Sequence, residues 1–524
     1  MTSHLIPDLL RTRAASAPDA VCCAMDDEVY TYADMDRRSD RVAAGLAALG
    51  IGPGERVATL APNRSELLEL FYGVAKSGAA QVPLNAYLKG EFLLHQLRQS
   101  RSGVLVTDTS GREALEPIRD QLPGLRTVVM LDETGAAEIS YQSLRETTGP
   151  PPDIALTAAD TMSILYTSGT TGLPKGCVAS HGYYLRSARL IGDALEIDDT
   201  DVLLAGLPLF HAGARLVTVT MPLVFGIPAY LQGTFSASGY FPRAREVGAT
   251  VMIAVGAMGA AILATEPGPA DRDHSVRRIM CAPLTLESQQ IFRERFGVEP
   301  WVDVFGQTEC MPTTLTPLSS DRRDPKGCGI PAPDLEVALL DEDGNALEGE
   351  AEGEICIRPR VPHAMFDGYF EQPAATQEAF RGLWYHTGDF GRRLPSGALA
   401  FVDRLKDCLR RRGENISSFE VEQAINHHPA VVESAVHAVP SPLGEDDLKA
   451  CLVVREPVEP AELFDFFKNS LPYFAIPRYI EFLDELPRNG VGRVLKHKLR
   501  DVGTGGNTID FKELNLSVAR DERR

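Results

Sequence analysis

Residues 165–176 read LYTSGTTGLPKG, and this stretch sets the first expectation about the fold. A segment so rich in glycine, serine and threonine has too little apolar surface to pack a core. Its backbone N–H groups and hydroxyls can instead converge on one point, and Lys175 adds a positive charge near its end. Converging amides and a cation suit a bound polyphosphate. The stretch therefore predicts a phosphate-binding loop.

The residues around this loop indicate an α/β fold. Residues 161–166 (TMSILY) are typical of a short apolar strand, and residues 183–195 (YYLRSARLIGDAL) of a helix. Upstream, from Arg56, short β-rich runs alternate with helical stretches such as residues 65–79. This alternation predicts a parallel sheet covered by helices. A strand, a glycine-rich loop and a helix in that order would present backbone amides to a phosphate.

The pattern changes after about residue 329. Turn signals at Asp343-Gly344 and Glu352-Gly353 separate alternating strands, which predicts a β-rich module. A compact segment with helical stretches follows Arg404, and residues 504–524 are polar and expected to form a loosely held tail.

Composition narrows the class of protein. A chain of 524 residues is too long for one hydrophobic core, and its net charge of −20 argues against nucleic-acid or membrane-surface binding. The nine cysteines form no CxxC pair and are expected to be reduced thiols in the cytoplasm. Residues 248–264 are apolar, but their glycines and alanines favour a buried strand followed by a helix over a membrane span.

The loop lacks the spacing of the P-loop found in ordinary NTPases. Residues 167–176 (TSGTTGLPKG) instead resemble the phosphate-binding signature of the acyl-adenylate-forming superfamily, which includes acyl-CoA ligases, adenylation domains of peptide synthetases and luciferases. Further segments match in order and distance: PLFHAGA at 208–214, CAPL at 281–284, VFGQTEC at 304–310, YHTGDFGRR at 385–393 and PRNGVGRVLKHKLR at 487–500. Residues 410–422 (RRRGENISSFEVE) resemble the carnitine-type and fatty-acid-type CoA ligases most.

The resemblance implies an α/β protein of two unequal domains. The large N-terminal domain, residues 1–403, would hold parallel-sheet α/β subdomains and the β-rich module at about 329–403. A hinge at 404–408 around Lys406 would lead to a small mobile α+β domain at 409–505 and a polar tail at 506–524. The implied reaction uses ATP and Mg²⁺ to adenylate a carboxylate, with release of pyrophosphate. The small domain then rotates so that the thiol of coenzyme A can attack the adenylate.

Two positions in VFGQTEC suit the reacting phosphates. Thr308 offers a hydroxyl to the α-phosphate, and Glu309 offers a carboxylate to Mg²⁺, which prefers oxygen ligands. The alternative is a strand cap with a solvated glutamate. The residues expected around the phosphates of ATP are Thr167, Ser168, Gly169, Thr170, Thr171, Gly172 and Lys175.

The base and the ribose of ATP have their own candidates. Phe305 offers a flat face to adenine, Asp303 could accept a hydrogen bond from its amino group, and Gly306 and Gln307 continue the same segment. Asp389 is suited to the ribose hydroxyls and Arg404 to a complementary donor, although a plain turn aspartate is the alternative. Backbone on the other side of the base would come from Ala282 and Pro283.

The region after the hinge is locally positive in an acidic chain. Between residues 404 and 413 there are five cations against one aspartate, a cluster that could attract the phosphates of coenzyme A or ATP, or could be a solvated basic face. Arg410, Gly413 and Glu414 belong to the segment that, by resemblance, lines the thioester-forming tunnel.

The acyl pocket is predicted to be short. His211 would lie at its mouth by resemblance, or would be a structural donor. Cys281 replaces a residue that is commonly glycine in relatives, and a side chain there would shorten the tunnel. Gly256 would leave space opposite, with Cys310, Met311 and Pro312 as a further wall. We expect a small or aromatic acid as the substrate.

One position departs from the family. Relatives carry a lysine that reaches both the carboxylate and the α-phosphate, and this chain has Arg493 there, a planar fork instead of a compact charge. Lys496 and Lys498, nearby, are expected to face solvent. Three hypotheses follow: an acyl-CoA ligase that tolerates Arg493, an enzyme that activates nitrite for an aryl amine, or a nucleotide-binding pseudoenzyme. Adenylation for a carrier protein is a further alternative. The expected partners are small molecules, and a homodimer is left open.

Overall fold

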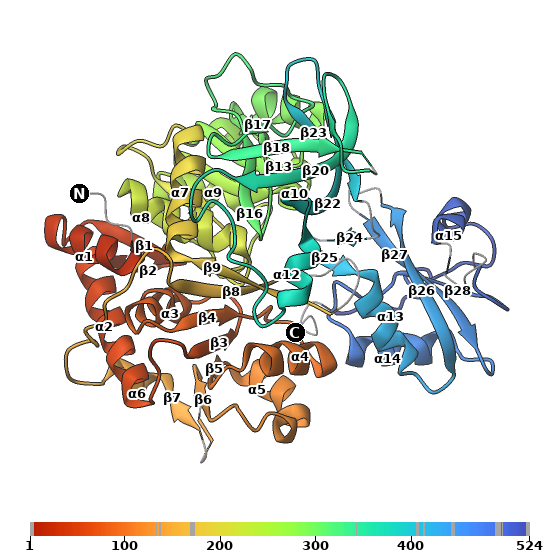
Figure 1. Ribbon diagram of the computed structural model, residues 1–524, viewed down its shortest axis with the longest axis horizontal. Helices are drawn as coiled ribbons and strands as arrows, with labels where there is room; N and C mark the ends of the chain where they lie inside the picture. Colours follow the sequence, from red (N-terminus) through yellow and green to blue (C-terminus); the bar gives the residue numbers. More distant parts are fainter. Residues whose placement is uncertain are drawn as a thin grey trace.

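A computed structural model describes residues 5–132, 134–135, 138–167, 173–341, 343–404, 408–411, 414–441, 446–487, 494 and 496–519. Figure 1 shows a large N-terminal region, coloured red to green, beside a smaller C-terminal region in blue. This division into a large mixed α/β domain and a small C-terminal domain confirms the predicted fold class.

The first sheet of the large domain carries the glycine-rich loop. Its strands are parallel except at one edge, where β8 and β9 are antiparallel. The order across the sheet is β7 (Ile139–Ser140), β6 (Thr127–Met130), β5 (Val104–Thr107), β3 (Arg56–Leu60), β4 (Ala80–Pro83), β8 (Thr161–Thr167) and β9 (Lys175–Ser180).

The second sheet is also parallel, except where β1 meets β2. Its order is β14 (Glu299–Trp301), β13 (Arg278–Ala282), β12 (Val251–Val255), β10 (Leu203–Ala205), β11 (Ala229–Leu231), β1 (Val21–Met25) and β2 (Glu28–Thr31). Side chains of both sheets share one hydrophobic core with α2 (Tyr32–Ala48), α3 (Ser65–Lys76) and α7 (His181–Ala194).

The helix α3 shows how tightly this core is built. All its residues except one are buried, because SELLELFYGVAK is apolar around most of its circumference. Gly73 lets α2 approach, since a Cβ there would lie 2.5 Å from Cγ1 of Val42. The large domain also contains α1 (Ile6–Ser16), α4 (Gly90–Ser100), α5 (Thr109–Leu115), α6 (Tyr141–Arg145), α8 (Met221–Phe225), α9 (Tyr240–Val247), α10 (Gly256–Leu263), α11 (Leu286–Ile291) and α12 (Pro373–Ala379).

The apolar run at residues 248–264 forms β12 followed by α10, as predicted. Within the described ranges, none of the helices has both the length and the apolar character needed to cross a membrane.

Two antiparallel sheets follow the second parallel sheet along the chain. A three-stranded sheet consists of β15 (Val304–Gln307), β16 (Cys310–Leu315) and β17 (Ile330–Pro331). A six-stranded antiparallel sheet follows, made of β19 (Ala346–Leu347), β18 (Leu335–Leu340), β20 (Glu352–Pro359), β22 (Trp384–Arg393), β21 (Phe380–Arg381) and β23 (Leu399–Arg404).

The small domain combines a hairpin, a four-stranded sheet and three helices. The hairpin pairs β24 (Cys408–Arg411) with β25 (Glu414–Ser417), and the sheet has the order β26 (Val431–Pro440), β27 (Asp446–Val454), β28 (Tyr479–Phe482) and β29 (Ile509–Asp510). The helices are α13 (Ser418–Asn426), α14 (Pro460–Ser470) and α15 (Lys496–Val502). The rings of Tyr87 and Tyr473 meet edge to face at 5.0 Å and join the two domains.

Two expectations from the sequence need correction. A strand, β9, comes between the glycine-rich loop and α7, because residues 175–180 pair with β8 as a hairpin, so the loop does not open directly into a helix. The polar tail is not loosely held throughout: β29 pairs with β28, and Phe511 is 1% exposed against Phe464 and Phe467. The buried ring of Phe511, the pairing of β29 with β28 and the ion pair of Asp510 with Arg478 together anchor this polar segment.

His181 should make the large domain sensitive to acid. Burial lowers its pKa from 6.5 to about 4, and the side chain stands at the start of α7, where a cation is also disfavoured. The unfolded chain therefore takes up this proton at a higher pH than the folded chain, and stability is lost as the pH falls from 6.5 towards 4. The loss is on the order of 3 kcal/mol.

Thermal unfolding midpoints at pH 7 and pH 5 test this expectation. His181→Gln should narrow the difference between the two midpoints, while the exposed His427→Gln should leave it unchanged. An equal acid response in wild type and His181→Gln would contradict it.

Candidate functional site

A cavity of about 1030 Å³ lies where the two domains meet. Residues from β8 and β9, from the segment at 207–217, from β15 and β16 and from the YHTGD segment contribute the walls on the large domain. The small domain contributes Ile416, Glu420 and Val421 near α13, together with residues at 472–475. The motifs that are far apart in the sequence therefore converge on one space.

Thr167 and Lys175 face each other as paired residues of the β8–β9 hairpin, and both line the cavity. The hydroxyl of Thr167 lies 3.5 Å from the carbonyl oxygen of Lys175. The hairpin thus fixes both ends of the predicted phosphate-binding loop. The predicted loop residues Ser168, Gly169, Thr170, Thr171 and Gly172 lie outside the described residues.

Glu309 is held beside this hairpin. Its Oε1 accepts hydrogen bonds from the Tyr369 hydroxyl at 2.9 Å and from the Thr167 hydroxyl at 3.4 Å. The residue is 7% exposed and lines the cavity. The ammonium of Lys175 lies over the face of the Tyr369 ring, 4.9 Å from its centre, while the hydroxyl of the same ring donates to Glu309. Both bonds fall on Oε1, which fits a carboxylate that offers Oε2 to a hard cation such as Mg²⁺.

Tyr369 was not predicted from the sequence. It belongs to the FDGYF segment at residues 366–370, whose aromatic residues and glycine give little sign of a polar role. Burial and the charge of Glu309 raise the pKa of its hydroxyl well above the usual range, so Tyr369 remains a hydrogen-bond donor at neutral pH.

Gln307 joins the end of β15 to the YHTGD segment. Its Nε2 donates to Oδ2 of Asp389 and to the carbonyl oxygen of Thr387, the latter at 2.9 Å, and its Oε1 accepts from Tyr385 at 3.1 Å. Asp389 is 1% exposed, and its backbone pairs with that of Arg404 across β22 and β23. The two predicted ribose residues are therefore neighbours on adjacent strands.

The predicted adenine site is only partly assembled from the expected side chains. Phe305, Gly306, Ala282 and Pro283 all line the cavity. A Cβ at Gly306 would lie 2.8 Å from the carbonyl oxygen of Cys310, which requires a glycine there. Asp303, in contrast, does not line the cavity.

Asp303 belongs to a buried ion pair instead. Its Oδ2 accepts from Nε of Arg323 at 2.8 Å, and the residue is 1% exposed. Burial raises the pKa of Asp303 above its usual value. The expected contact between this carboxylate and an adenine amino group is therefore not supported by its position.

The apolar end of the cavity contains His211. Its ring lies 4.5 Å from that of Phe210, and Thr308, Met280 and Met311 line the same cavity. The hydroxyl of Tyr183 donates to the carbonyl oxygen of Thr308 at 3.0 Å, which fixes the backbone just before Glu309. Small residues, Ala212, Gly213 and Ala214, continue from His211 and leave space beside it.

Cys281 does not form a wall of this cavity. Alternation along β13 turns Met280 and Ala282 towards the cavity and Cys281 towards α10, where a Cβ on Gly259 would lie 2.6 Å from its sulfur. Gly256 also has a different role from the expected one, since a Cβ there would lie 2.5 Å from the carbonyl oxygen of Pro283. The wall consists of Met280 and Ala282 instead.

Alternation along β16 likewise places only some of the residues after Glu309 on the cavity side. Met311 lines the cavity, whereas Cys310 is fully buried with its thiol 3.8 Å from the carbonyl oxygen of Ala364. Pro312 is buried on the same side as Cys310 and does not line the cavity. Only Met311 of the three is placed where a substrate could contact it.

The β24–β25 hairpin of the small domain contributes Ile416 to the cavity wall, and its strands pair Arg410 with Asn415 and Arg411 with Glu414. Arg411 is used internally, in an ion pair with Asp447 at 3.2 Å. Glu420 lines the cavity, and burial raises its pKa to about 8. The predicted residues Lys406, Gly413 and Arg493 lie outside the described residues.

The helix that follows Arg493 packs away from the cavity. Lys496, expected in solvent, lies 2.6 Å from Glu422 and 2.7 Å from the hydroxyl of Ser418. No described residue after Ala475 lines the cavity. Among the described residues of the small domain, those that line the cavity therefore include members of the hairpin, the start of α13 and the segment 472–475, but none of α15.

Comparisons with known proteins identify the family of this chain. The family model described as AMP-binding enzyme matches residues 10–370, and that described as AMP-binding enzyme C-terminal domain matches residues 420–493. A crotonobetaine/carnitine–CoA ligase of Salmonella arizonae is 31% identical over 489 residues, covering 91% of this chain and 94% of that protein.

Solved structures give the same result. The o-succinylbenzoate CoA synthetase of Bacillus subtilis, as a double mutant bound with a product analogue, has a TM-score of 0.83 at 29% identity, covering 94% of this chain and 98% of that one. The enzyme in complex with AMP has a TM-score of 0.68 at 29% identity, covering 95% and 99%. A fatty acyl CoA synthetase of Mycobacterium tuberculosis has a TM-score of 0.69 at 29% identity, covering 95% and 98%. The chain therefore belongs to the AMP-binding enzyme family.

Proposed function

We propose that this protein is an AMP-forming acid–thiol ligase, which adenylates a small or aromatic carboxylic acid with ATP and transfers the acyl group to coenzyme A. The observation that carries the proposal is the position of Glu309, held by Thr167 and Tyr369 beside the phosphate-loop hairpin and at the edge of an apolar space. Glu309, the two ends of the predicted phosphate loop and several apolar side chains all line one cavity, which supports this proposal.

The chain's own residues account for the binding of both substrates in this proposal. Lys175 and the ends of the loop hold the phosphates, Asp389 and Gln307 hold the ribose, and Phe305 supports the base. Glu309 would hold Mg²⁺, which neutralises phosphate charge when bound. The acid then lies with its tail against Met280 and its carboxylate near Thr308.

The proposed substrate class follows from the apolar end of the cavity. Leu207, Ile253, Val255, Met280 and Met311 line it without a charged group of their own. Such a surface favours an uncharged acyl tail, since a buried unpaired charge would be costly. The small residues 212–214 leave width beside His211, which suits a branched or aromatic tail.

The position of the small domain supports the thiol-transfer step. One named enzyme matches this chain with a TM-score of 0.83 when bound with a product analogue and 0.68 in complex with AMP, at 29% identity each time. A change of that size at equal identity fits two arrangements of one domain against another. The β24–β25 hairpin near the cavity and α15 away from it are consistent with the arrangement for thioester formation.

The first prediction concerns the acceptor. Purified protein with Mg·ATP and coenzyme A should release pyrophosphate and form a thioester with short, branched or aromatic acids. Nitrite with an aminoaryl acid is the comparison reaction. Pyrophosphate release with nitrite alone would contradict the proposal and favour a diazotising enzyme, and no release with any acceptor would favour a pseudoenzyme.

The second prediction concerns Glu309. Glu309→Gln keeps the shape but removes the negative charge, so pyrophosphate release should fall by about 10²–10³, the range found when one transition-state contact is lost. Tyr369→Phe should have a smaller effect, because the hydroxyl only orients the carboxylate. The matched control is the exposed Glu348→Gln. Activity of Glu309→Gln within about twofold of the control, a difference of only some 0.4 kcal/mol, would contradict the role.

The third prediction concerns Arg493. Because adenylation forces two anions together, Arg493→Ala should lower adenylate formation by at least about 100-fold. Thioester formation from a supplied acyl-adenylate should change little, since the second step does not need that cation. Arg493→Lys should retain adenylation, because the charge is kept. Equal loss in both half-reactions would contradict this separation of roles.

A further inference from the structure

Glu354, Cys356 and His386 bring a carboxylate, a thiol and an imidazole together on one face of the β-rich module. Glu354 and Cys356 are alternate residues of β20, so their side chains share a face, and His386 is paired opposite Cys356 on β22. Among the described residues, these three form the group of His, Cys, Asp and Glu donors whose ligand atoms all lie within 4.8 Å of one another. None of them has a part in the proposed reaction.

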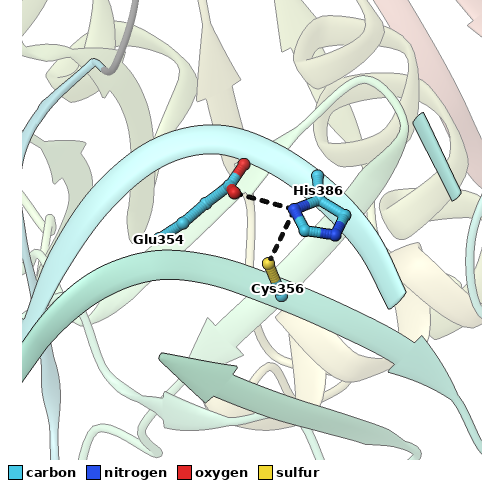
Figure 2. Close-up of side chains that lie close together, drawn as sticks. All are labelled: Glu354, Cys356 and His386. Carbon is cyan, nitrogen blue, oxygen red and sulfur yellow. Dashed lines mark hydrogen bonds and ion pairs between the residues drawn. The ribbon is translucent and has the colours of Figure 1, made fainter. Parts of the chain in front are cut away.

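The donors converge on a single atom. Figure 2 shows the Glu354 carboxylate and the Cys356 sulfur directed at the same nitrogen of the His386 ring. Nδ1 lies 2.7 Å from Oε2 of Glu354 and 3.4 Å from Sγ of Cys356. One ring nitrogen can carry only one proton, so it cannot satisfy both neighbours fully.

One of these two separations is close to that around a tetrahedral zinc ion. Bonds of about 2.0–2.1 Å to nitrogen, 2.0–2.2 Å to oxygen and 2.3 Å to sulfur place nitrogen about 3.4 Å from oxygen and about 3.6 Å from sulfur. The Cys356–His386 distance nearly matches already. The Glu354 carboxylate must move back by roughly 0.7 Å, which small changes in its side-chain torsions provide.

The surroundings also leave the right oxygen available. The backbone N–H of Gly388 donates to Oε1 of Glu354 at 3.0 Å, which holds the carboxylate and leaves Oε2 facing the histidine. Hydrogen bonds of this kind, made to a ligand by its neighbours, orient metal ligands in known sites. Glu354 and His386 line the cavity, so an ion could enter from it and keep a fourth position open.

We propose that Glu354, Cys356 and His386 form a binding site for one thiophilic divalent cation, with Zn²⁺ the best match to this set of sulfur, nitrogen and oxygen donors. This site shares no residue with the Mg²⁺ site expected at Glu309. The two sites also differ in ligand type, since Mg²⁺ prefers oxygen ligands alone.

On binding, the Cys356 thiol loses its proton to solvent, and the neutral imidazole carries its proton on Nε2 so that Nδ1 can bind the metal. Burial and the charge of Glu354 raise the pKa of the Cys356 thiol without a metal, so the thiol is protonated and unreactive in that state. The cation thus takes the place of the hydrogen-bonding proton between Nδ1 of His386 and its neighbours Glu354 and Cys356.

A metal ion bound to Glu354, Cys356 and His386 would stiffen the segment of β22 that contains Asp389, the proposed ribose ligand. His386 is three residues before Asp389 on the same strand, and a metal would tie this segment to β20. We expect the bound ion to raise the unfolding temperature of the full-length protein by several degrees without any nucleotide.

Cobalt titration of the full-length, metal-free protein tests the site without ATP, acid or coenzyme A. One equivalent of Co²⁺ should produce a near-ultraviolet thiolate-to-cobalt band and visible bands of a four-coordinate ion, and one equivalent of Zn²⁺ should bleach them. Millimolar Mg²⁺ should not. Absence of the thiolate band in wild type would overturn the proposal.

Variants assign the donors. Cys356→Ser should abolish the thiolate band, while Cys328→Ser, a partly buried cysteine of the same module, should keep it. His386→Ala should keep a thiolate band but weaken cobalt binding by at least tenfold. A band that persists in Cys356→Ser would overturn the proposal. If Cys356→Ser does not fold, Glu354→Gln serves as the second variant, and unchanged cobalt affinity and visible bands in it would overturn the three-donor site.

Discussion

The hydrogen bonds that Thr167 and Tyr369 donate to Glu309 connect three segments of the candidate site that are far apart in the sequence. They join residues 142 and 60 positions apart in the chain, from the phosphate-loop hairpin, the end of β15 and the segment before α12. A carboxylate buried beside a phosphate loop would repel the substrate unless a cation were bound between them. The position of Glu309 therefore supports the proposed site, in which a bound cation would separate this carboxylate from a polyphosphate.

The proposed substrates are anions, and the chain that would bind them is itself acidic. The net charge of −20 disfavours anions over the whole surface, so local groups must attract them. Lys175 supplies one such charge within the cavity, beside Tyr369. Glu420, which enters the cavity from the small domain, has a pKa raised to about 8 and so adds little negative charge at neutral pH. Burial thus removes a charge that would oppose binding.

Much of this site could be predicted from short motifs, because residues close in sequence have little freedom in where they lie. Thr308 and Glu309 follow a strand, and Asp389 and Arg404 fall on paired strands. The predictions failed where a side chain's direction depends on strand alternation or on a distant partner. Cys281 faces α10, and Asp303 pairs with Arg323, 20 residues away. Tyr369 was missed because its partner, Glu309, is remote in sequence, and Phe511 because its polar surroundings resemble a free tail.

The most direct test of the central claim follows the oxygen atoms of the acid. A turned-over carboxylic acid labelled with ¹⁸O at both carboxylate oxygens should transfer one label to AMP and keep one in the thioester, with none in pyrophosphate. That distribution requires attack of the carboxylate on the α-phosphate and later displacement of AMP by the thiol. Unlabelled AMP, or ADP with label in inorganic phosphate, would contradict the account.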